Sequence, residues 1–342
     1  MSDRTPSARF SDAAGGTASG VVLVTGATGV LGARLVRALR ARGFSVRGLS
    51  PPGDPGRARL DGLGCTLVEG DVRNAGAVPG LFAGIDTVYH LAAVILSPDP
   101  QVFETVNRQG TAEMVTAAAR AGVRHFVYVS SASVTYPKLT PYGHSKLAGE
   151  ALVKAETRFQ HTIVRPTLVY DEGGGQEFQL FLRYLQRWPV VPFIGDGRAW
   201  KRPVFAGDVV DGLAAIAGNQ KSYGKTYNLS GADRIRLIDL ARLMLAHHDG
   251  FGQHRFLLPI PVMFAKAAAR CMGALMKDPP LTLQAIAGLV NDADLPPDEA
   301  MRDLGYRPTD IRSGFARCFS QRNPAFHVAN SGVEPVTKEI VT

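Results

Sequence analysis

Cysteine is scarce in this chain, and its three copies, Cys65, Cys271 and Cys318, lie far apart along the sequence. Their positions show none of the short spacings typical of metal-binding cysteines, so we expect no metal site. A chain with few, scattered cysteines also fits a reduced compartment. The sequence therefore predicts a cytoplasmic location.

The sequence also lacks an uninterrupted apolar run long enough to span a bilayer. Residues 257–276 are apolar, but Pro259, Pro261, Lys266 and Arg270 interrupt them. We favour a helix of a smaller lobe that packs over a cleft. The alternative is peripheral contact with a membrane surface as a basic amphipathic helix. Residues 1–19 have no apolar core of a secretory signal and are expected to form a disordered tail.

Dense basic runs with interleaved aromatic residues are missing as well, although the formal net charge is +8. The arginines are spread over predicted helix faces, which disfavours nucleic acid as a partner. An anionic small ligand accounts for part of the excess charge. The 342 residues, 45% hydrophobic and 20% charged, indicate a soluble globular protein with a full core.

The most informative segment is 21–43, which reads VVLVTGATGVLGARLVRALRARG. Apolar residues predict a buried strand, and an amphipathic helix pattern follows directly. Between them, Gly26 permits a tight turn, Gly29 lets the backbone approach a pyrophosphate, and Gly32 allows close helix–strand packing. The free amides and positive dipole end of the helix then bind the diphosphate. The predicted nucleotide contacts in this segment are Gly26, Thr28, Gly29, Val30, Leu31 and Gly32.

No carboxylate stands at the end of the next predicted strand, 45–50, where it would bind the ribose 2′-hydroxyl of NAD. Ser50 occupies that position and is the predicted ribose contact, while Asp54 follows later in a loop. This absence slightly favours NADP over NAD, with Arg57 or Arg59 available for the 2′-phosphate. The alternative is that both arginines are merely solvated.

The rest of the chain alternates strand and helix patterns. Strands are predicted at 65–69, 86–93, 125–131 and 162–169, and helices at 107–121 and 142–153. This order predicts an α/β fold, a doubly wound parallel sheet of the Rossmann type with a smaller C-terminal α/β substrate lobe. We expect a nucleotide-binding domain over 20–170, an interleaved lobe over 171–320 and a tail over 321–342.

Two strand ends carry residues that fit a flat nucleotide. Asp71 could bind the adenine amino group or simply cap the next turn. Small residues such as Ala92 and Ala93 would let a cofactor lie close to the backbone.

Tyr142 and Lys146 lie one turn apart on a predicted helix and therefore on one face. A tyrosine phenol is a poor base at its usual pKa near 10. A nearby ammonium and a positively charged nicotinamide ring would favour the phenolate. Ser131, at the end of the strand before this helix, could orient a substrate oxygen.

Together these motifs resemble the extended short-chain dehydrogenase/reductase family, which contains the NAD-dependent epimerases and dehydratases. The resemblance runs from about residue 21 to residue 315. It rests on TGATGVLG at 25–32, GDV at 70–72, HLAA at 90–93, NRQGT at 107–111, VSSASV at 129–134, YGHSK at 142–146 and RPTLVY at 165–170.

The resemblance implies a role for each matching residue. Tyr142 would be the catalytic base or acid, Lys146 would bind the nicotinamide ribose and lower the tyrosine pKa, and Ser131 would bond the reacting oxygen. Asn107 would support a proton-relay water. The other implied contacts are Asp71, Val72, Leu91, Ala92, Ala93, Val129 and Pro166 with the cofactor, and Ser133 and Arg202 with the substrate.

Departures from the nucleotide-sugar epimerase pattern leave the substrate open. Leu168 and Asp171 stand where that group usually has Asn and Gly, and no second phosphate-binding arginine is found near 291–295. Arg202 matches the first such arginine and slightly favours a nucleotide sugar. Leu168 and the apolar segment 257–276 favour an apolar ring alcohol, since RPTLVY is also similar to the 3β-hydroxysteroid dehydrogenase branch.

An alternative of another class is a non-catalytic NAD(P)-binding subunit or assembly protein. The intact Ser131, Tyr142 and Lys146 set counts against it, because a scaffold does not need a matched acid/base pair. We therefore expect a small-molecule substrate. A homodimer is one oligomeric state that the sequence allows. Arg202 could also be a surface arginine paired with a carboxylate such as Asp208, which would contribute little.

Overall fold

The computed structural model describes residues 20–171, 175–248, 255–276 and 281–318. The tails expected at 1–19 and 321–342 lie outside these residues. None of the described helices is long and apolar enough to cross a membrane.

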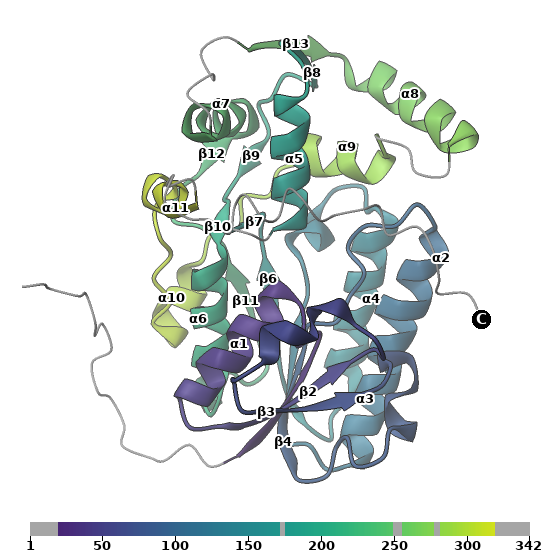
Figure 1. Ribbon diagram of the computed structural model, residues 1–342, viewed down its shortest axis with the longest axis vertical. Coiled ribbons are helices and arrows are strands. Elements are labelled where there is room, and N and C mark those ends of the chain that lie inside the picture. The colour runs from purple at the N-terminus through teal and green to yellow at the C-terminus, as the bar shows by residue number, and fades with distance from the viewer. Residues whose placement is uncertain (1–19, 172–174, 249–254, 277–280, 319–342) are drawn as a thin grey trace, which may run out of the picture.

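A seven-stranded sheet forms the centre of the molecule (Figure 1). Its strand order is β11-β6-β5-β4-β1-β2-β3, and every pair of neighbours is parallel. The strands are β1 Val21–Thr25, β2 Ser45–Ser50, β3 Cys65–Glu69, β4 Ile85–His90, β5 His125–Val129, β6 Gln160–Pro166 and β11 Lys225–Leu229. The predicted doubly wound parallel sheet is thus confirmed. Because β11 comes from beyond residue 170, the two expected parts of the chain interleave in this sheet.

Helices cover both faces of the sheet. One face packs against α1 (Val30–Ala41), α6 (Ala206–Ile216) and α10 (Asp298–Leu304), and the other against α3 (Gly110–Arg120) and α4 (Pro141–Ala155). Both layers bury aliphatic side chains, as expected for strands that are apolar on both faces. Short 3₁₀ helices η1 (Pro55–Leu60), η2 (Val72–Ala77), η4 (Ala132–Thr135) and η5 (Gln220–Ser222) lie in the connections.

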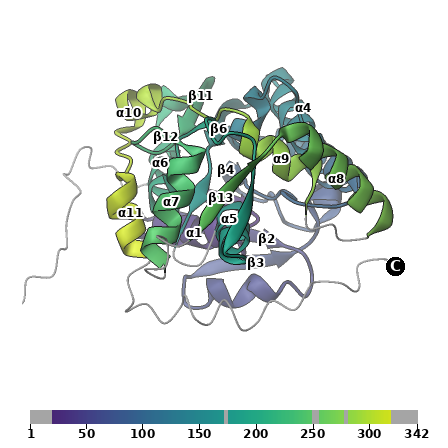
Figure 2. The ribbon, with the colours of Figure 1, turned by 90° about the horizontal axis from the view of Figure 1, so that it is seen from above.

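A smaller lobe lies beyond the carboxyl ends of the strands (Figures 1 and 2). Its core joins α5 (Gln176–Gln186), α7 (Leu237–His248) and α11 (Ile311–Cys318). Three two-stranded sheets complete it: β7 (Val169–Tyr170) with β10 (Val204–Phe205), β8 (Val190–Ile194) with β13 (Phe256–Ile260), and β9 (Trp200–Lys201) with β12 (Ile235–Arg236). Two further helices, α8 (Val262–Leu275) and α9 (Leu283–Val290), form its outer edge.

Three predicted strands continue past the observed ends. The strands expected at 86–93, 125–131 and 162–169 end at His90, Val129 and Pro166. Beyond these points the backbone leaves the ladder to form turns and side-chain contacts at the sheet's carboxyl edge. The residues that follow these strands therefore lie at the carboxyl edge of the sheet instead of extending it.

The segment 257–276 is also not a single element. It comprises β13 and α8, which meet at Pro261, the residue that precedes the first turn of α8. Proline cannot donate a backbone hydrogen bond, so the strand pattern ends there and a helix begins.

Candidate active site

The glycine-rich turn joins β1 to α1 at the middle of the sheet. Gly26 has φ of +66°, a conformation that favours glycine. A Cβ on Gly32 would lie 2.0 Å from the Gly26 carbonyl oxygen, so the helix can pack this closely only with glycine there. Gly29 caps the helix, and the first turn of α1 contains no acidic residue. Its free amides and the helix dipole therefore remain suited to an anion.

The end of β4 lies directly beside this turn. A Cβ on Gly26 would meet the Ala92 backbone nitrogen at 3.0 Å. The Ala92 amide donates to Thr25 Oγ1 at 3.1 Å, and this oxygen lies 2.7 Å from Nδ1 of buried His90. Burial lowers the pKa of His90 to about 3, so the ring is neutral. β1 and β4 flank the point where the strand order reverses, which is where open α/β sheets bind ligands.

In the region expected to bind the ribose, the side chains form hydrogen bonds and an ion pair with groups of the protein itself. Ser50 is buried at the end of β2 and donates to the Pro51 carbonyl oxygen. Thr28 donates through its hydroxyl to Asp54, and its carbonyl oxygen accepts from Arg59 at 2.8 Å. Arg57 forms an ion pair with Glu69. Of the two arginines named from the sequence, Arg59 is the one held against the glycine-rich turn.

Asp71 takes the capping role that the sequence left open. Its carboxylate accepts from the Arg73 amide at 2.8 Å at the start of η2, where Val72 is buried. The Arg73 guanidinium also binds both oxygens, and these hydrogen bonds lower the Asp71 pKa. An adenine contact for Asp71 stays a prediction.

Tyr142 and Lys146 lie on the first two turns of α4. Thr140 caps this helix by accepting from the Gly143 amide at 3.0 Å, and Pro141 supplies a preset φ in the first turn. Both site residues are buried, Tyr142 with 8% and Lys146 with 2% of its surface exposed. Burial, and then the nearby Glu177 carboxylate, raise the Tyr142 pKa, while a hydrogen bond with Ser131 lowers it.

The predicted action of Lys146 on Tyr142 stays a prediction. Lys146 Nζ lies 4.2 Å from the centre of the Tyr128 ring, and burial lowers its pKa to about 7. In the protein alone the Tyr142 pKa is raised, because desolvation opposes the charged phenolate more strongly than its neighbours favour it.

Asn107 lies in a π-helix, Phe103–Gln109, where the sequence predicted the start of an α-helix at 107. The preceding short helix α2 is Pro100–Val102. The Asn107 amide accepts from the Val94 amide at 2.8 Å and donates to the Val94 carbonyl oxygen at 2.9 Å. It also donates to Ser145 of α4 at 3.1 Å. The wider π-turn, frequent at functional sites, aims this side chain at the loop after β4.

The serines after β5 form a compact turn. Ser131 caps η4 by accepting from the Ser133 amide at 3.1 Å, and the Ser133 hydroxyl donates to Ser131 Oγ at 3.0 Å. Val129 is the last residue of β5, and Ser130 is buried. Ser131 Oγ is thus engaged by the turn, and its role toward a substrate oxygen stays a prediction.

Glu150 is a buried residue of this site that the sequence analysis missed. Its carboxylate accepts hydrogen bonds from the Ser130 hydroxyl at 2.6 Å and from Nε and Nη2 of Arg165 at 2.8 and 2.6 Å. Burial raises its pKa, but the hydrogen bonds from Arg165 and Ser130 outweigh burial and lower it. Glu150 thereby ties α4 to the ends of β5 and β6. The signal was present: an acidic residue one turn after Lys146 on the same face.

Arg202 has a carboxylate partner, but a different one from Asp208. Its Nε lies 2.5 Å from Asp294, which Arg234 also contacts at 2.7 Å. Asp208 instead accepts from Thr309. A substrate diphosphate would therefore have to displace Asp294 from Arg202.

Leu168 and Asp171, the two departures from the nucleotide-sugar pattern, each contact another part of the protein. Pro166 ends β6 opposite Leu229, and Leu168 is partly buried against the core of the lobe. The buried Asp171 carboxylate lies 2.6 Å from Arg34 of α1. This ion pair ties the lobe to the helix that follows the glycine-rich turn.

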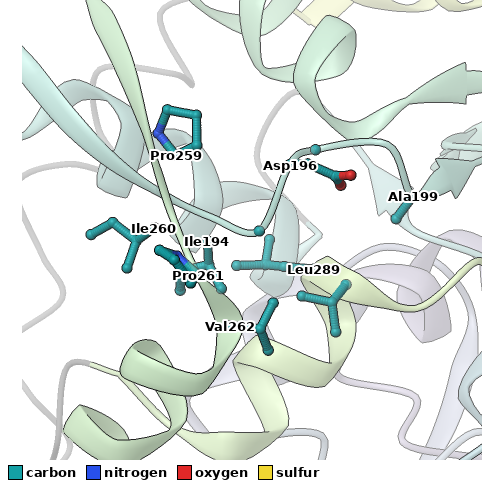
Figure 3. A pocket seen from close by; sticks show the side chains of 11 residues that line it. Ile194, Asp196, Ala199, Pro259, Ile260, Pro261, Val262 and Leu289 are labelled. Carbon is teal, nitrogen blue, oxygen red and sulfur yellow. The ribbon is translucent and has the colours of Figure 1, made fainter.

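A cavity of about 510 Å³ opens in the smaller lobe (Figure 3). It lies between the β8 end, β13 and α9, and its lining includes Ile194, Ile260, Val262 and Leu289, with Asp196 as the acidic group. None of the predicted catalytic residues lines it.

We expect Glu150→Gln to lower the free energy of unfolding by about 1.5–3 kcal/mol, the range for hydrogen bonds to a charged group. Since the folded-state pKa of Glu150 is lowered, its contribution is present above its unfolded-state pKa and is lost as pH falls through the folded value. Urea denaturation at pH 7 and pH 4 should therefore show a smaller difference between variant and parent at the acidic pH.

Glu104→Gln is the matched control, because Glu104 forms an exposed pair with Arg108 and should contribute little. Equal losses in the two variants would contradict the anchoring role of Glu150.

The chain is similar to curated proteins named as a reductase and a dehydrogenase. The ceramide reductase of Caulobacter vibrioides is 37% identical over 177 residues, 52% of this chain and 55% of that protein. The 3β-hydroxysteroid dehydrogenase/Δ5→4-isomerase of Mycobacterium tuberculosis is 28% identical over 270 residues, 69% of this chain and 72% of that protein.

Solved structures agree on the fold. The dTDP-glucose 4,6-dehydratase of Streptomyces venezuelae, with NAD bound, superimposes with a TM-score of 0.66 at 24% identity, covering 88% of this chain and 96% of that one. The profile of the NAD-dependent epimerase/dehydratase family matches residues 22–230. This match spans more than half of the chain and agrees with its glycine-rich turn and parallel sheet, so the chain belongs to the NAD-dependent epimerase/dehydratase family.

Proposed function

We propose that this protein moves a hydride between a nicotinamide cofactor and a secondary alcohol or ketone of an apolar molecule. The observation that supports the proposal is that Tyr142 and Lys146 are both buried on the first two turns of α4, in a chain that belongs to an NAD-dependent family. Tyr142 is buried, and Ser131 is the neighbour that lowers the pKa of its phenol against the larger effect of burial. This is the arrangement needed to move a proton on a reacting oxygen.

The chain's own residues divide the remaining work. The turn at Gly26 and the amides of α1 would hold the diphosphate, and when bound the cofactor supplies the hydride acceptor or donor. Ser131 would donate to the substrate oxygen, and Tyr142 would take or give its proton. Lys146, with a pKa near 7, would place positive charge at the ribose end of the site. Asn107 fixes the loop at Val94 and α4 relative to each other.

The apolar substrate is favoured by the arginine pairing. Arg202 is occupied by Asp294, and Arg234 shares that same carboxylate. Leu168 replaces a polar residue expected for a nucleotide sugar and packs into the lobe. The names of the ceramide reductase and hydroxysteroid dehydrogenase relatives point to the same class of substrate.

A nucleotide sugar, our first expectation from the sequence, is the second candidate. It is supported by the position of Arg202, whose guanidinium is only partly buried and also donates to the Ala232 carbonyl oxygen. An arginine can bind a diphosphate bidentately once released from its carboxylate.

For the cofactor we infer a modest preference for NADP. No carboxylate follows β2 directly, and Arg59 is held beside the glycine-rich turn by the Thr28 carbonyl. A guanidinium in this position suits a 2′-phosphate.

Tyr142→Phe keeps the ring and removes only the oxygen that transfers the proton. We expect turnover to fall by about 10²–10⁴, with folding and cofactor affinity retained. Lys146→Met should lower both turnover and cofactor affinity, because the ammonium serves both. Steady-state rates on a sterol or sphingoid ketone panel, with cofactor affinity by calorimetry, provide the measurement. Full activity of Tyr142→Phe would support the non-catalytic alternative instead.

The substrate class is decided by titrating nucleoside diphosphates and apolar ring alcohols against the parent and Arg202→Ala. For an apolar substrate, no nucleoside diphosphate should bind either protein at millimolar concentration, and the substitution should leave turnover nearly unchanged. Binding that the substitution weakens by about 1.5–3 kcal/mol, as expected for a charged hydrogen bond, would establish the nucleotide-sugar candidate.

The cofactor preference is tested by measuring NADP and NAD affinity for Arg59→Ala. We expect NADP binding to weaken by about 1.5–3 kcal/mol and NAD binding to change little. Arg57→Ala is the control, since that guanidinium is paired with Glu69. A parent that binds NAD more tightly than NADP would reject the inference.

A further inference from the structure

The outer edge of the smaller lobe exposes an unusual number of large apolar side chains. We call this surface the apolar rim; it consists of Phe256, Leu258, Met263, Phe264, Leu275 and Leu283 on β13, α8 and α9. Phe256 and Phe264 are each 61% exposed, Met263 71% and Leu275 86%. Large apolar side chains exposed on neighbouring elements, here consecutive β13 and α8 and the adjacent α9, mark a candidate interaction site.

Helix α8 is packed with its small residues inward and its large ones outward. The buried residues of α8 are Ala265 and Ala269, which contact the minor core formed with Ile194 and Ile286. A helix folded for its own domain's core shows the reverse arrangement. Figures 1 and 2 show α8 at the periphery of the lobe beside α9, with one side open in both views.

The charges on the rim have one sign. Lys266 and Arg270 are exposed on α8, and residues 255–276 and 281–291 contain no Asp or Glu. Basic side chains interleaved with Met, Phe and Leu on one helix are the pattern of an interfacial helix on anionic lipid. The core of a protein–protein interface is depleted in Lys, whereas a layer of anionic lipid headgroups accepts both Lys and Arg.

The rim is connected to the candidate active site. Gln284, next to Leu283 on α9, donates to the Ile95 carbonyl oxygen at 2.6 Å. Ile95 follows Val94, whose backbone is held by Asn107. The rim and the loop after β4 are therefore neighbours, and a bilayer under the rim would lie near the entrance of the crevice.

We propose that the apolar rim docks this protein on the surface of an anionic lipid bilayer, with α8 lying in the headgroup layer. Met263, Phe264 and Leu275 would insert, and Lys266 and Arg270 would remain at the phosphates. Docking does not depend on the substrate or on turnover, so it stands apart from the proposed function. An apolar alcohol could then reach the crevice without crossing water.

The test is flotation of the full-length protein with vesicles of phosphatidylcholine alone or with 30% phosphatidylglycerol, a composition chosen to supply about the charge of an anionic membrane. We expect binding to the anionic vesicles only, reversed by high salt. Met263→Ser/Phe264→Ser and Lys266→Glu/Arg270→Glu should each reduce partitioning about tenfold or more. The controls are Met301→Ser and Arg312→Glu, exposed positions on α10 and α11 that should not change it.

A second readout reports the position of α8. Cys271 is exposed on α8, whereas Cys65 is half-buried with a raised pKa and Cys318 is buried, so a polarity-sensitive thiol dye should label Cys271. Its emission should shift to the blue with anionic vesicles. No binding by the parent, or equal binding by rim and control variants, would overturn the proposal. So would sedimentation showing that the rim substitutions abolish a dimer while vesicles remain unbound.

Discussion

The close approach of three backbone segments at the carboxyl end of β1 is the constraint on which the site depends. The Gly26 carbonyl oxygen lies where a Cβ on Gly32 would be, and Ala92 lies against Gly26 itself. This packing fixes the start of α1 and the loop after β4 relative to each other. The start of α1 and the small residues after β4 thereby lie side by side at the switch point of the sheet, where open α/β sheets bind ligands.

Helix α4, which carries the proposed catalytic residues, is held in that frame by buried polar contacts. Glu150 joins α4 to Ser130 and Arg165, and Asn107 joins α4 to the loop after β4. Buried polar groups of this kind are costly unless each finds a partner, and here they do. As a result Tyr142 has a fixed position but a raised pKa in the protein alone.

The smaller lobe differs from the sheet in how its helices are packed. Its core around α5, α7 and α11 is packed with aromatic and aliphatic side chains, while α8 keeps only alanines inside. The same segment looked from the sequence like an interrupted apolar helix that covers a cleft. Its prolines instead split it into β13 and α8, and the split turns Met263 and Phe264 outward.

Local sequence alone determined the strand–turn–helix at 21–43 and the spacing of Tyr142 and Lys146, because glycine conformation and helical periodicity are local properties. The parallel sheet followed from the alternation of such units. Tertiary structure decided which partner each side chain found. Arg202 binds Asp294, 92 residues away, and Lys146 of α4 lies over the ring of Tyr128 on β5. Which side chains come together from distant parts of the sequence depends on how the elements pack, and a local sequence pattern does not show it.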